Sequence, residues 1–212
     1  MAWACVLPLA AQQLAVLKYD GGGDWYANPT SLPNLARFCN EQLGSRLELK
    51  PAQVSFKSDE VFAYPFLHMT GHGNVVFSEE EQARIRRYLD AGGFLHIDDN
   101  YGMDPFIRPI LESLFADSPL EELAISSFLF QYPFTLPNGL PKVHAHDEQP
   151  PQAWVIRRNG RIVLLYTYES DLGDGWEDAE VHNDSEEIRQ LALKMGGNMI
   201  AYAFSLRNDP AE

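Results

Sequence analysis

Short apolar segments of strand length alternate with helical segments along most of this chain, and this alternation restricts the fold more than any other feature. LAVLKYD (14–20), FLHMTGHG (66–73) and FLHIDD (94–99) predict strands. Helices are predicted between them, over 31–44 and 78–93, because each segment begins with a capping residue and ends with Gly. Strands that alternate with helices pair in parallel, so we expect an α/β fold with a mostly parallel sheet.

The predicted helix starts rest on particular residues. Ser31 is the expected cap of the first helix, and Ser78 with Glu81 has the spacing of a capping box for the second. The last helix is predicted over 184–204, with Asp184 and Glu187 at its start.

The remaining segments predict weaker elements. A strand is expected within 47–56, where a proline confines it to a sheet edge, and a helix over 103–115. The proline-rich segment 131–152 contains aromatic residues, which favours an ordered loop or flap over a flexible linker. AWVIRRNGRIVLLYTYES (153–170) predicts a hairpin that turns at Asn159 and Gly160.

Composition limits both the number of domains and the partners. A chain of 212 residues with 45% hydrophobic content can bury one sizeable core, so we expect a single domain over 14–207 and a short tail over 208–212. The net charge of −14 would repel phosphate backbones, and no cluster of Lys and Arg offsets it. Nucleic acid is therefore excluded as a partner. No run after the N-terminus has the roughly 20 apolar residues of a membrane span. We assign no oligomeric state.

The first residues, MAWACVLPLAAQQ (1–13), resemble the apolar region and cleavage site of a secretory signal peptide. The basic start of such a peptide is missing, because no Lys or Arg precedes Lys18. Either the true start lies upstream, or the segment is a buried strand with an apolar tail. We favour export, and so a periplasmic or secreted location. Cys5 lies in this segment, and Cys39 lies on an apolar helical face, where we expect it to be buried.

Polar residues cluster where four of the predicted strands end, at 20–26, 70–73, 98–101 and 168–178. The carboxyl ends of parallel strands form one rim of a sheet, and ligands bind there in open α/β folds. The candidate ligand-binding residues at this rim are Asp20, Asp24, Trp25, Tyr26, Gly71, His72, Asp98, Asp99, Asn100, Tyr101, Glu169, Asp171, Asp174 and Trp176. Trp25 and Tyr26 offer flat surfaces of the kind on which sugars stack.

The carboxylates have two interpretations. Asp98 and Asp99 are adjacent on a strand and so point to opposite faces, which means that a catalytic pair would join one of them to Glu169, Asp171 or Asp174. The alternative is that they cap turns and helices. The segment 168–178 also resembles a calcium loop, although it lacks the EF-hand spacing, and a solvated acidic loop is the simpler reading.

The histidines suggest different roles. We expect His68 and His96 to be buried strand residues with hydrogen-bond partners, and His72, between two glycines at a strand end, to be functional. His144 and His146 alternate as two zinc ligands on one strand would, but they lie among prolines. We predict no cofactor and leave a divalent metal ion open. There is no G-x-S-x-G motif and no Cys at the end of a predicted sheet strand, so acyl transfer lacks its usual nucleophile.

Three segments carry a family resemblance: LKYDGGGDWYANPTSLPNLARFCNEQL, YPFLHMTGHGNVVFSEEEQARIRRYLDAGGFLHIDDNYG and YTYESDLGDGWEDAEVHND. They resemble the bacterial family called domain of unknown function 4159, and the resemblance covers nearly everything after residue 13. It implies an exported protein with a fold similar to the class I glutamine amidotransferases. That fold is a flavodoxin-like three-layer sandwich with a mostly parallel central sheet, to which this chain would add a β-hairpin.

The resemblance implies no activity. The amidotransferases carry a Cys after a strand preceded by AGG, and here AGGFLHIDDNYG has Asp98 to Tyr101 at that place. We therefore expect no glutaminase activity and leave open whether the protein is an enzyme. The first hypothesis is a module that binds a small molecule or glycan at the rim. The alternatives are a carboxylate- or metal-dependent hydrolase and an envelope assembly protein that docks a partner through 131–152.

Overall fold

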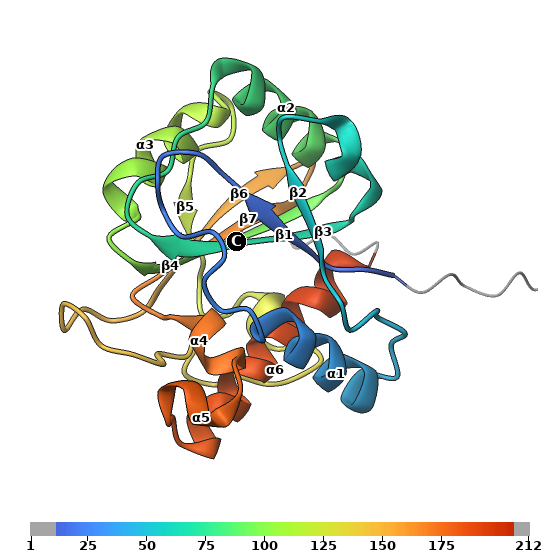
Figure 1. The fold of residues 1–212 in the computed structure, drawn as a ribbon, viewed down its shortest axis with the longest axis vertical. Coiled ribbons are helices and arrows are strands. Elements are labelled where there is room, and N and C mark those ends of the chain that lie inside the picture. The colour runs from blue at the N-terminus through green and yellow to red at the C-terminus, as the bar shows by residue number, and fades with distance from the viewer. Residues whose placement is uncertain (1–11, 206–212) are drawn as a thin grey trace, which may run out of the picture.

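The computed structural model describes residues 12–205, which form one seven-stranded sheet between two layers of helices (Figure 1). The strand order is β2-β1-β3-β4-β7-β6-β5. The strands are β1 (Ala15–Lys18), β2 (Ala52–Ser55), β3 (Phe66–His72), β4 (Phe94–Tyr101), β5 (Glu121–Glu122), β6 (Gln152–Arg158) and β7 (Arg161–Tyr168). Most of the predicted signal peptide, Cys5 and the predicted tail lie outside the described residues.

Five neighbouring strands, β2, β1, β3, β4 and β7, run in parallel. Their order is the 2-1-3-4-5 order of flavodoxin-like folds when they are counted along the chain. β6 is antiparallel to β7 and turns into it at Asn159 and Gly160, both at positive φ, as the hairpin prediction requires. The α/β architecture with a mostly parallel sheet and an added hairpin is thus confirmed.

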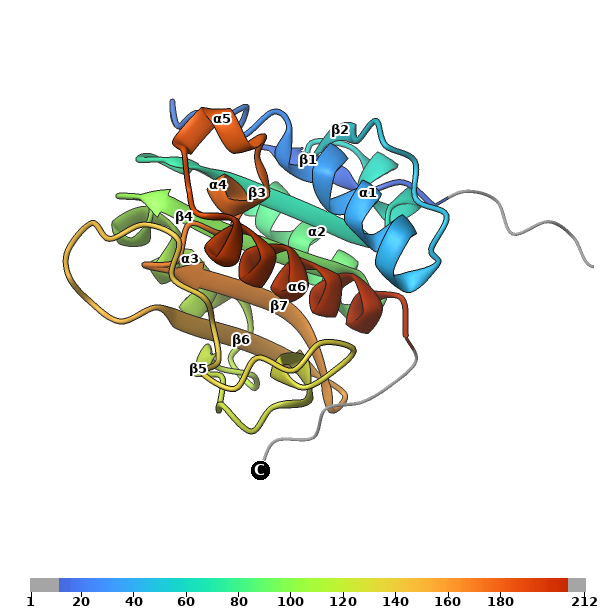
Figure 2. The same cartoon turned by 90° about the horizontal axis from the view of Figure 1, so that it is seen from below.

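Helices cover both faces of the sheet. α2 (Glu79–Asp90) and α3 (Asp104–Leu114) lie on one face, and α1 (Ser31–Leu43) and α6 (Glu186–Ala203) lie on the other (Figures 1 and 2). Each face has its own apolar core, because successive strand residues point to opposite sides: Leu14 joins the α1 and α6 layer, and Ala15 the α2 and α3 layer. The shorter helical segments are α4 (Leu172–Trp176), α5 (Ala179–His182) and the 3₁₀ turns η1 (Asp59–Ala63) and η2 (Phe128–Phe130).

Two of the predicted helix caps are wrong by one residue. α2 has the predicted capping box between Ser78 and Glu81. α1, however, is preceded by Thr30, and Ser31 is already the first helical residue. α6 is capped by Ser185, whose hydroxyl accepts a hydrogen bond from the backbone N–H of Ile188 at 3.3 Å.

The flap over 131–152 is anchored to the body of the domain. The side chain of Asn198 in α6 accepts a hydrogen bond from the backbone N–H of Phe134 at 2.8 Å and donates to its carbonyl at 2.7 Å. Leu136 and Leu140 of the flap are buried in the core beside α1 and α6. The flap is therefore ordered, as expected. Among residues 12–205, no helix combines the length and apolar character that a bilayer crossing requires.

Candidate functional site

The carboxyl ends of β1, β3, β4 and β7 meet at one rim, where α4 and α5 follow β7 (Figure 1). Asp98, near the end of β4, is fully buried on the side of the sheet that carries α4. Its Oδ2 accepts a hydrogen bond from the N–H of Gly173 at 2.6 Å, and its Oδ1 accepts one from the hydroxyl of Thr167 at 2.6 Å. Burial raises the pKa of Asp98 to about 7.

Asp99 is buried on the opposite side, towards α3. Its two oxygens accept hydrogen bonds from the backbone N–H groups of Met103 at 2.9 Å and Asp104 at 2.8 Å, at the start of α3. Burial raises the pKa of Asp99 to about 6. Asp98 thus binds the backbone of α4, and Asp99 binds the start of α3 on the opposite face of the sheet.

Asn100 in β4 connects β3, the loop after β1 and α4 at the rim. Its Oδ1 accepts a hydrogen bond from the hydroxyl of Thr70 at 2.7 Å, and its amide donates to Asp174 Oδ1 at 3.1 Å. The amide also donates to the side-chain oxygen of Asn28 at 2.9 Å, and Asn28 donates in turn to Asp174. Asp174 is therefore held from the β1 loop and from β4 together.

Three histidines converge on the acidic residues that follow β7. We call His144, His146, His182, Asp171, Asp174, Glu177 and Asp184 the histidine cluster. Within it, His144 Nδ1 lies 2.9 Å from Asp174 Oδ2, and His146 Nε2 lies 2.6 Å from Asp171 Oδ2. The other nitrogen of His144 lies 3.1 Å from Asp184, and His182 lies 3.2 Å from Glu177.

The charges of the histidine cluster are mutually dependent. Hydrogen bonds to Asp171 and Asp174 raise the pKa of His144 to about 10. Burial alone would raise the pKa of Asp174, but hydrogen bonds from His144 and Asn28 outweigh burial and hold that pKa below its usual value. The carboxylates thus bind a charged imidazolium at neutral pH.

The histidine cluster has the donor atoms of a metal site. One ligand atom each of His144, Asp174 and His182 lies within 4.8 Å of the other two. The side chain of Asp171 is fully buried, and its Oδ1 has no hydrogen-bond partner, nor does Asp184 Oδ2. A buried carboxylate oxygen without a donor is costly, and a bound cation would satisfy it.

The β1 and β3 end of the rim has a separate polar pair. His72 Nδ1 lies 3.0 Å from Asp24 Oδ2, and 53% of the His72 side chain is exposed. This pair requires Gly71, whose φ is +140° and whose added Cβ would lie 2.2 Å from the phenol oxygen of Tyr19. Tyr26, two residues after Asp24 in the sequence, is 66% exposed.

The structure brings some of the predicted residues together and separates others. Asn100, Asp171 and Asp174 lie in or against the histidine cluster, and Asp98 lies directly behind it. Tyr101 is 47% exposed, and its ring lies 4.6 Å from that of His146.

Other predicted residues lie elsewhere. Asp20 pairs with Lys57 at 2.6 Å, and buried Glu169 pairs with Lys142 at 3.1 Å. Trp25 packs partly against the core under Lys18. Trp176 is fully buried and donates to the carbonyl of Ala192 at 2.8 Å, so it does not face the rim.

His68 and His96 are buried, as predicted, and their Nδ1 atoms lie 3.0 Å apart. The sequence reasoning missed Asn28, Glu177, His182 and Asp184, although the segment EVHND (180–184) holds two of them. It considered His144 and His146 for zinc as ligands on one strand. They lie instead on an irregular part of the flap, and both contact Asp171.

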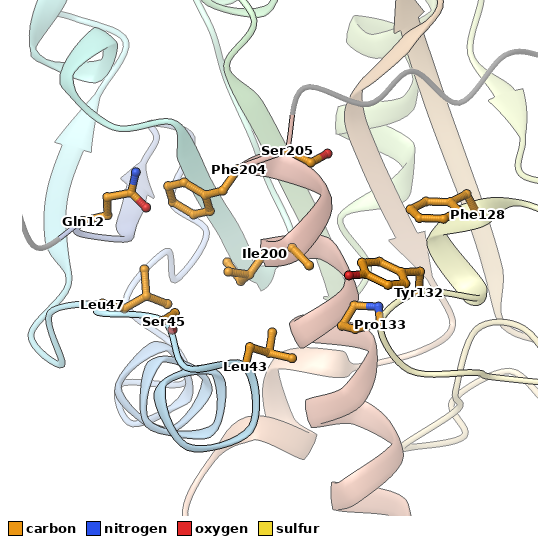
Figure 3. Close-up of a pocket in the computed structure, with 11 residues that line it drawn as sticks. Gln12, Leu43, Ser45, Leu47, Phe128, Tyr132, Pro133, Ile200, Phe204 and Ser205 are labelled. Atoms are coloured by element: carbon orange, nitrogen blue, oxygen red, sulfur yellow. The ribbon is translucent and has the colours of Figure 1, made fainter. Parts of the chain in front are cut away.

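A groove of about 390 Å³ lies at the other end of the sheet, beyond the amino end of β1. Its walls include Leu43, Leu47, Ile200 and Phe204, whose side chains surround it in Figure 3. None of the predicted site residues lines this groove.

No curated protein matches this chain. The sequence model of the family described as a domain of unknown function (DUF4159) matches residues 13–204, which include the whole rim and the histidine cluster. The chain therefore belongs to the DUF4159 family.

Proposed function

We propose that this domain binds a divalent metal ion in the histidine cluster, with His144, Asp174 and His182 as protein ligands. The observation that carries this proposal is the convergence of their three ligand atoms within 4.8 Å, beside the unpartnered buried oxygen of Asp171. Imidazole and carboxylate donors suit zinc, and three protein ligands leave a fourth position for water or substrate. Sites of that kind are catalytic more often than structural.

The activity that this donor set supports best is metal-dependent hydrolysis. A metal ion there would acidify a bound water molecule and polarise a carbonyl group. Asp171 is suited to accept a proton in such a reaction, because one of its oxygens is free while His146 holds the other. Four carboxylates surround the three imidazoles, and this charge favours a neutral or cationic substrate over a phosphate ester.

A glycan-binding module is the second candidate, and a specific observation favours it. Tyr101 is nearly half exposed and lies against His146, so its ring borders the histidine cluster. A sugar that stacks on Tyr101 would reach the same site. The assembly hypothesis has less support, because residues of the flap are committed to the domain's own core and to the histidine cluster.

Calorimetric titration of the chelator-treated protein with Zn²⁺ tests the first proposal. We expect one ion to bind, with release of the proton from His144, and His182→Ala to weaken binding by at least 100-fold. His72→Ala is the matched control, because His72 lies with Asp24 outside the histidine cluster. The proposal fails if the parent protein binds no Zn²⁺ at micromolar concentration or if His182→Ala binds it equally well. Binding of neutral sugars that persists without metal and is lost in Tyr101→Ala would favour the glycan module.

We further propose that the fold is the amidotransferase-like variant of the flavodoxin-like sandwich, without its glutaminase activity. The resemblance supports this, because AGG leads into β4 and would put Asp98 to Tyr101 where the amidotransferases have their nucleophile. Asp98 is bound by the backbone of residues 172 and 173. A glutaminase assay should give no turnover, and release of ammonia from glutamine would refute this part.

We also propose that the protein is exported, from the apolar segment over 1–13. Fusion of that segment to alkaline phosphatase, which needs an oxidising compartment to fold, should yield an active enzyme. An inactive fusion that is active with a known signal peptide would contradict export.

A further inference from the structure

A buried chain of polar side chains runs from the interior of the sheet to the histidine cluster. His68 and His96 in β3 and β4 contact each other through their Nδ1 atoms at 3.0 Å. The Nε2 of His96 lies 3.0 Å from the hydroxyl of Thr167 in β7, which donates to Asp98 at 2.6 Å. All four residues are at most 1% exposed. Buried polar groups are costly, so a connected set of four requires a reason beyond packing.

This series of hydrogen-bonded side chains ends at Asp98, which binds the segment that carries two acidic residues of the histidine cluster. Asp98 accepts hydrogen bonds from the backbone N–H groups of Leu172 at 3.3 Å and Gly173 at 2.6 Å. These two residues lie between Asp171 and Asp174 in the sequence. The positions of both carboxylates therefore depend on the hydrogen bonds that Asp98 makes.

The geometry around this segment leaves little freedom. Asp171 has a φ of +56°, which is uncommon for a residue with a side chain and needs support from its surroundings. An added Cβ on Gly173 would lie 3.1 Å from Asp98 Oδ2 and 2.9 Å from the amide of Asn28. Gly173 thus allows the backbone to approach Asp98 closely.

The contacts from His68 to Asp98 can all be hydrogen bonds at once, because their donors and acceptors can be matched. With Asp98 ionised, Thr167 donates to Asp98, and the Thr167 oxygen can accept from Nε2–H of His96. His96 Nδ1 is then free to accept from Nδ1–H of His68. Each of these contacts has one donor and one acceptor, so the chain fixes the orientation of the Thr167 hydroxyl.

We infer that Asp98 is a positioning residue for the metal site: supported by Thr167 and the two buried histidines, it holds the backbone of Leu172 and Gly173 so that Asp171 and Asp174 face the ion. This inference rests on the proposed metal binding. Asp98 itself contacts neither the metal ion nor the substrate. Residues that orient metal ligands from behind change affinity 10- to 100-fold when they are replaced.

Asp99 provides a matched control within the same strand. It has the same charge, is 2% exposed, and also accepts two backbone hydrogen bonds, but it binds the start of α3 instead of α4. Replacement of either residue by Asn removes one charge and one acceptor oxygen. Only Asp98→Asn places an amide donor among the hydrogen bonds that hold residues 172 and 173.

The test compares Zn²⁺ affinities by competition with a chromophoric chelator, together with the visible spectrum of the Co²⁺-loaded protein. Asp98→Asn should bind Zn²⁺ 10- to 100-fold more weakly than the parent and alter the Co²⁺ spectrum. Asp99→Asn should stay within about threefold of the parent, with an unchanged spectrum, even if its unfolding midpoint falls. Equal affinities for the parent and Asp98→Asn would overturn the inference, as would an equal loss in the two variants.

Thr167 supplies a second test should Asp98→Asn fold poorly. Thr167→Val removes the hydroxyl that supports Asp98, and Thr167→Ser keeps it. We expect Thr167→Val to bind Zn²⁺ more weakly than the parent and Thr167→Ser to bind it about as well as the parent. Equal affinities in the two variants would refute the support of Asp98 by the Thr167 hydroxyl. If the parent protein itself binds no Zn²⁺, the proposed function fails. If the parent protein binds Zn²⁺ and Asp98→Asn binds it equally well, only the positioning role of Asp98 fails.

Discussion

Asp98→Asn should change how the stability of the metal-free protein depends on pH. Burial raises the pKa of Asp98 to about 7 in the folded protein, whereas the carboxyl of the unfolded chain titrates near 3.8. Between these values the folded state holds a proton that the unfolded state has lost, so the free energy of unfolding falls as pH rises. The slope is about 1.4 kcal/mol per pH unit well below pH 7 and half of that at the pKa itself, which amounts to about 2 kcal/mol between pH 5 and pH 7.

The amide that replaces the carboxyl cannot titrate, so the variant lacks this contribution. Relative to the parent, Asp98→Asn should therefore gain about 2 kcal/mol between pH 5 and pH 7, whatever its stability at pH 5. Other titrating groups are common to both proteins and largely cancel in the difference. Asp99→Asn should show the same sign, but its difference should level off above pH 6, since the pKa of Asp99 is raised only to about 6.

Urea unfolding of both proteins, followed by circular dichroism in the presence of a chelator at pH 5, 6, 7 and 8, measures this difference. A stability difference between parent and Asp98→Asn that stays constant from pH 5 to pH 8 would refute the reasoning. It would mean that the backbone donors at residues 172 and 173 keep Asp98 ionised throughout that range.

Three other changes have clear expected outcomes. Gly71→Ala should lower the free energy of unfolding by about 3 kcal/mol or more, because its Cβ would overlap the phenol of Tyr19. Gly73→Ala, which is also at positive φ but has open space, should cost about 1 kcal/mol, and equal losses in urea unfolding would contradict the overlap. Asn198→Ala should cost about 3 kcal/mol or more by leaving buried backbone groups of the flap unpaired, and a fall of the thermal midpoint with faster proteolysis of the flap checks this. In a Cys5→Ser background, Cys39 should not react with Ellman's reagent until the protein unfolds, because it is fully buried and burial raises its pKa to about 12; a fast reaction of the native protein would contradict this placement.

The sheet and its helices were predictable because the signals are local. The capping box at Ser78 and the turn at Asn159 and Gly160 depend on a few adjacent residues, and both are present in the structure. The two wrong caps also have a local cause, since Thr30 and Ser31, and Asp184 and Ser185, are adjacent residues that can each cap a helix. Long-range contacts decide between them: Thr30 Oγ1 contacts Glu177 at 3.1 Å, and Asp184 contacts His144.

The candidate site was predictable only in part. The side-chain alternation of a strand correctly separates Asp98 from Asp99, and the rim rule correctly brings Asn100 near Asp174. The sequence does not show that His144 from the flap meets His182 from α5, because 38 residues separate them and no periodic pattern connects the two segments. Nor does it show which backbone groups each carboxylate binds.

Both ends of the described chain lie at the apolar groove, since Gln12 and Ser205 are among its lining residues (Figure 3). The histidine cluster lies at the other end of α6, a helix of 18 residues that spans about 27 Å. Attachment of the protein to a bead or sensor surface through either end should therefore leave the rim facing the solution. Immobilised protein should then bind Zn²⁺ as well as free protein does.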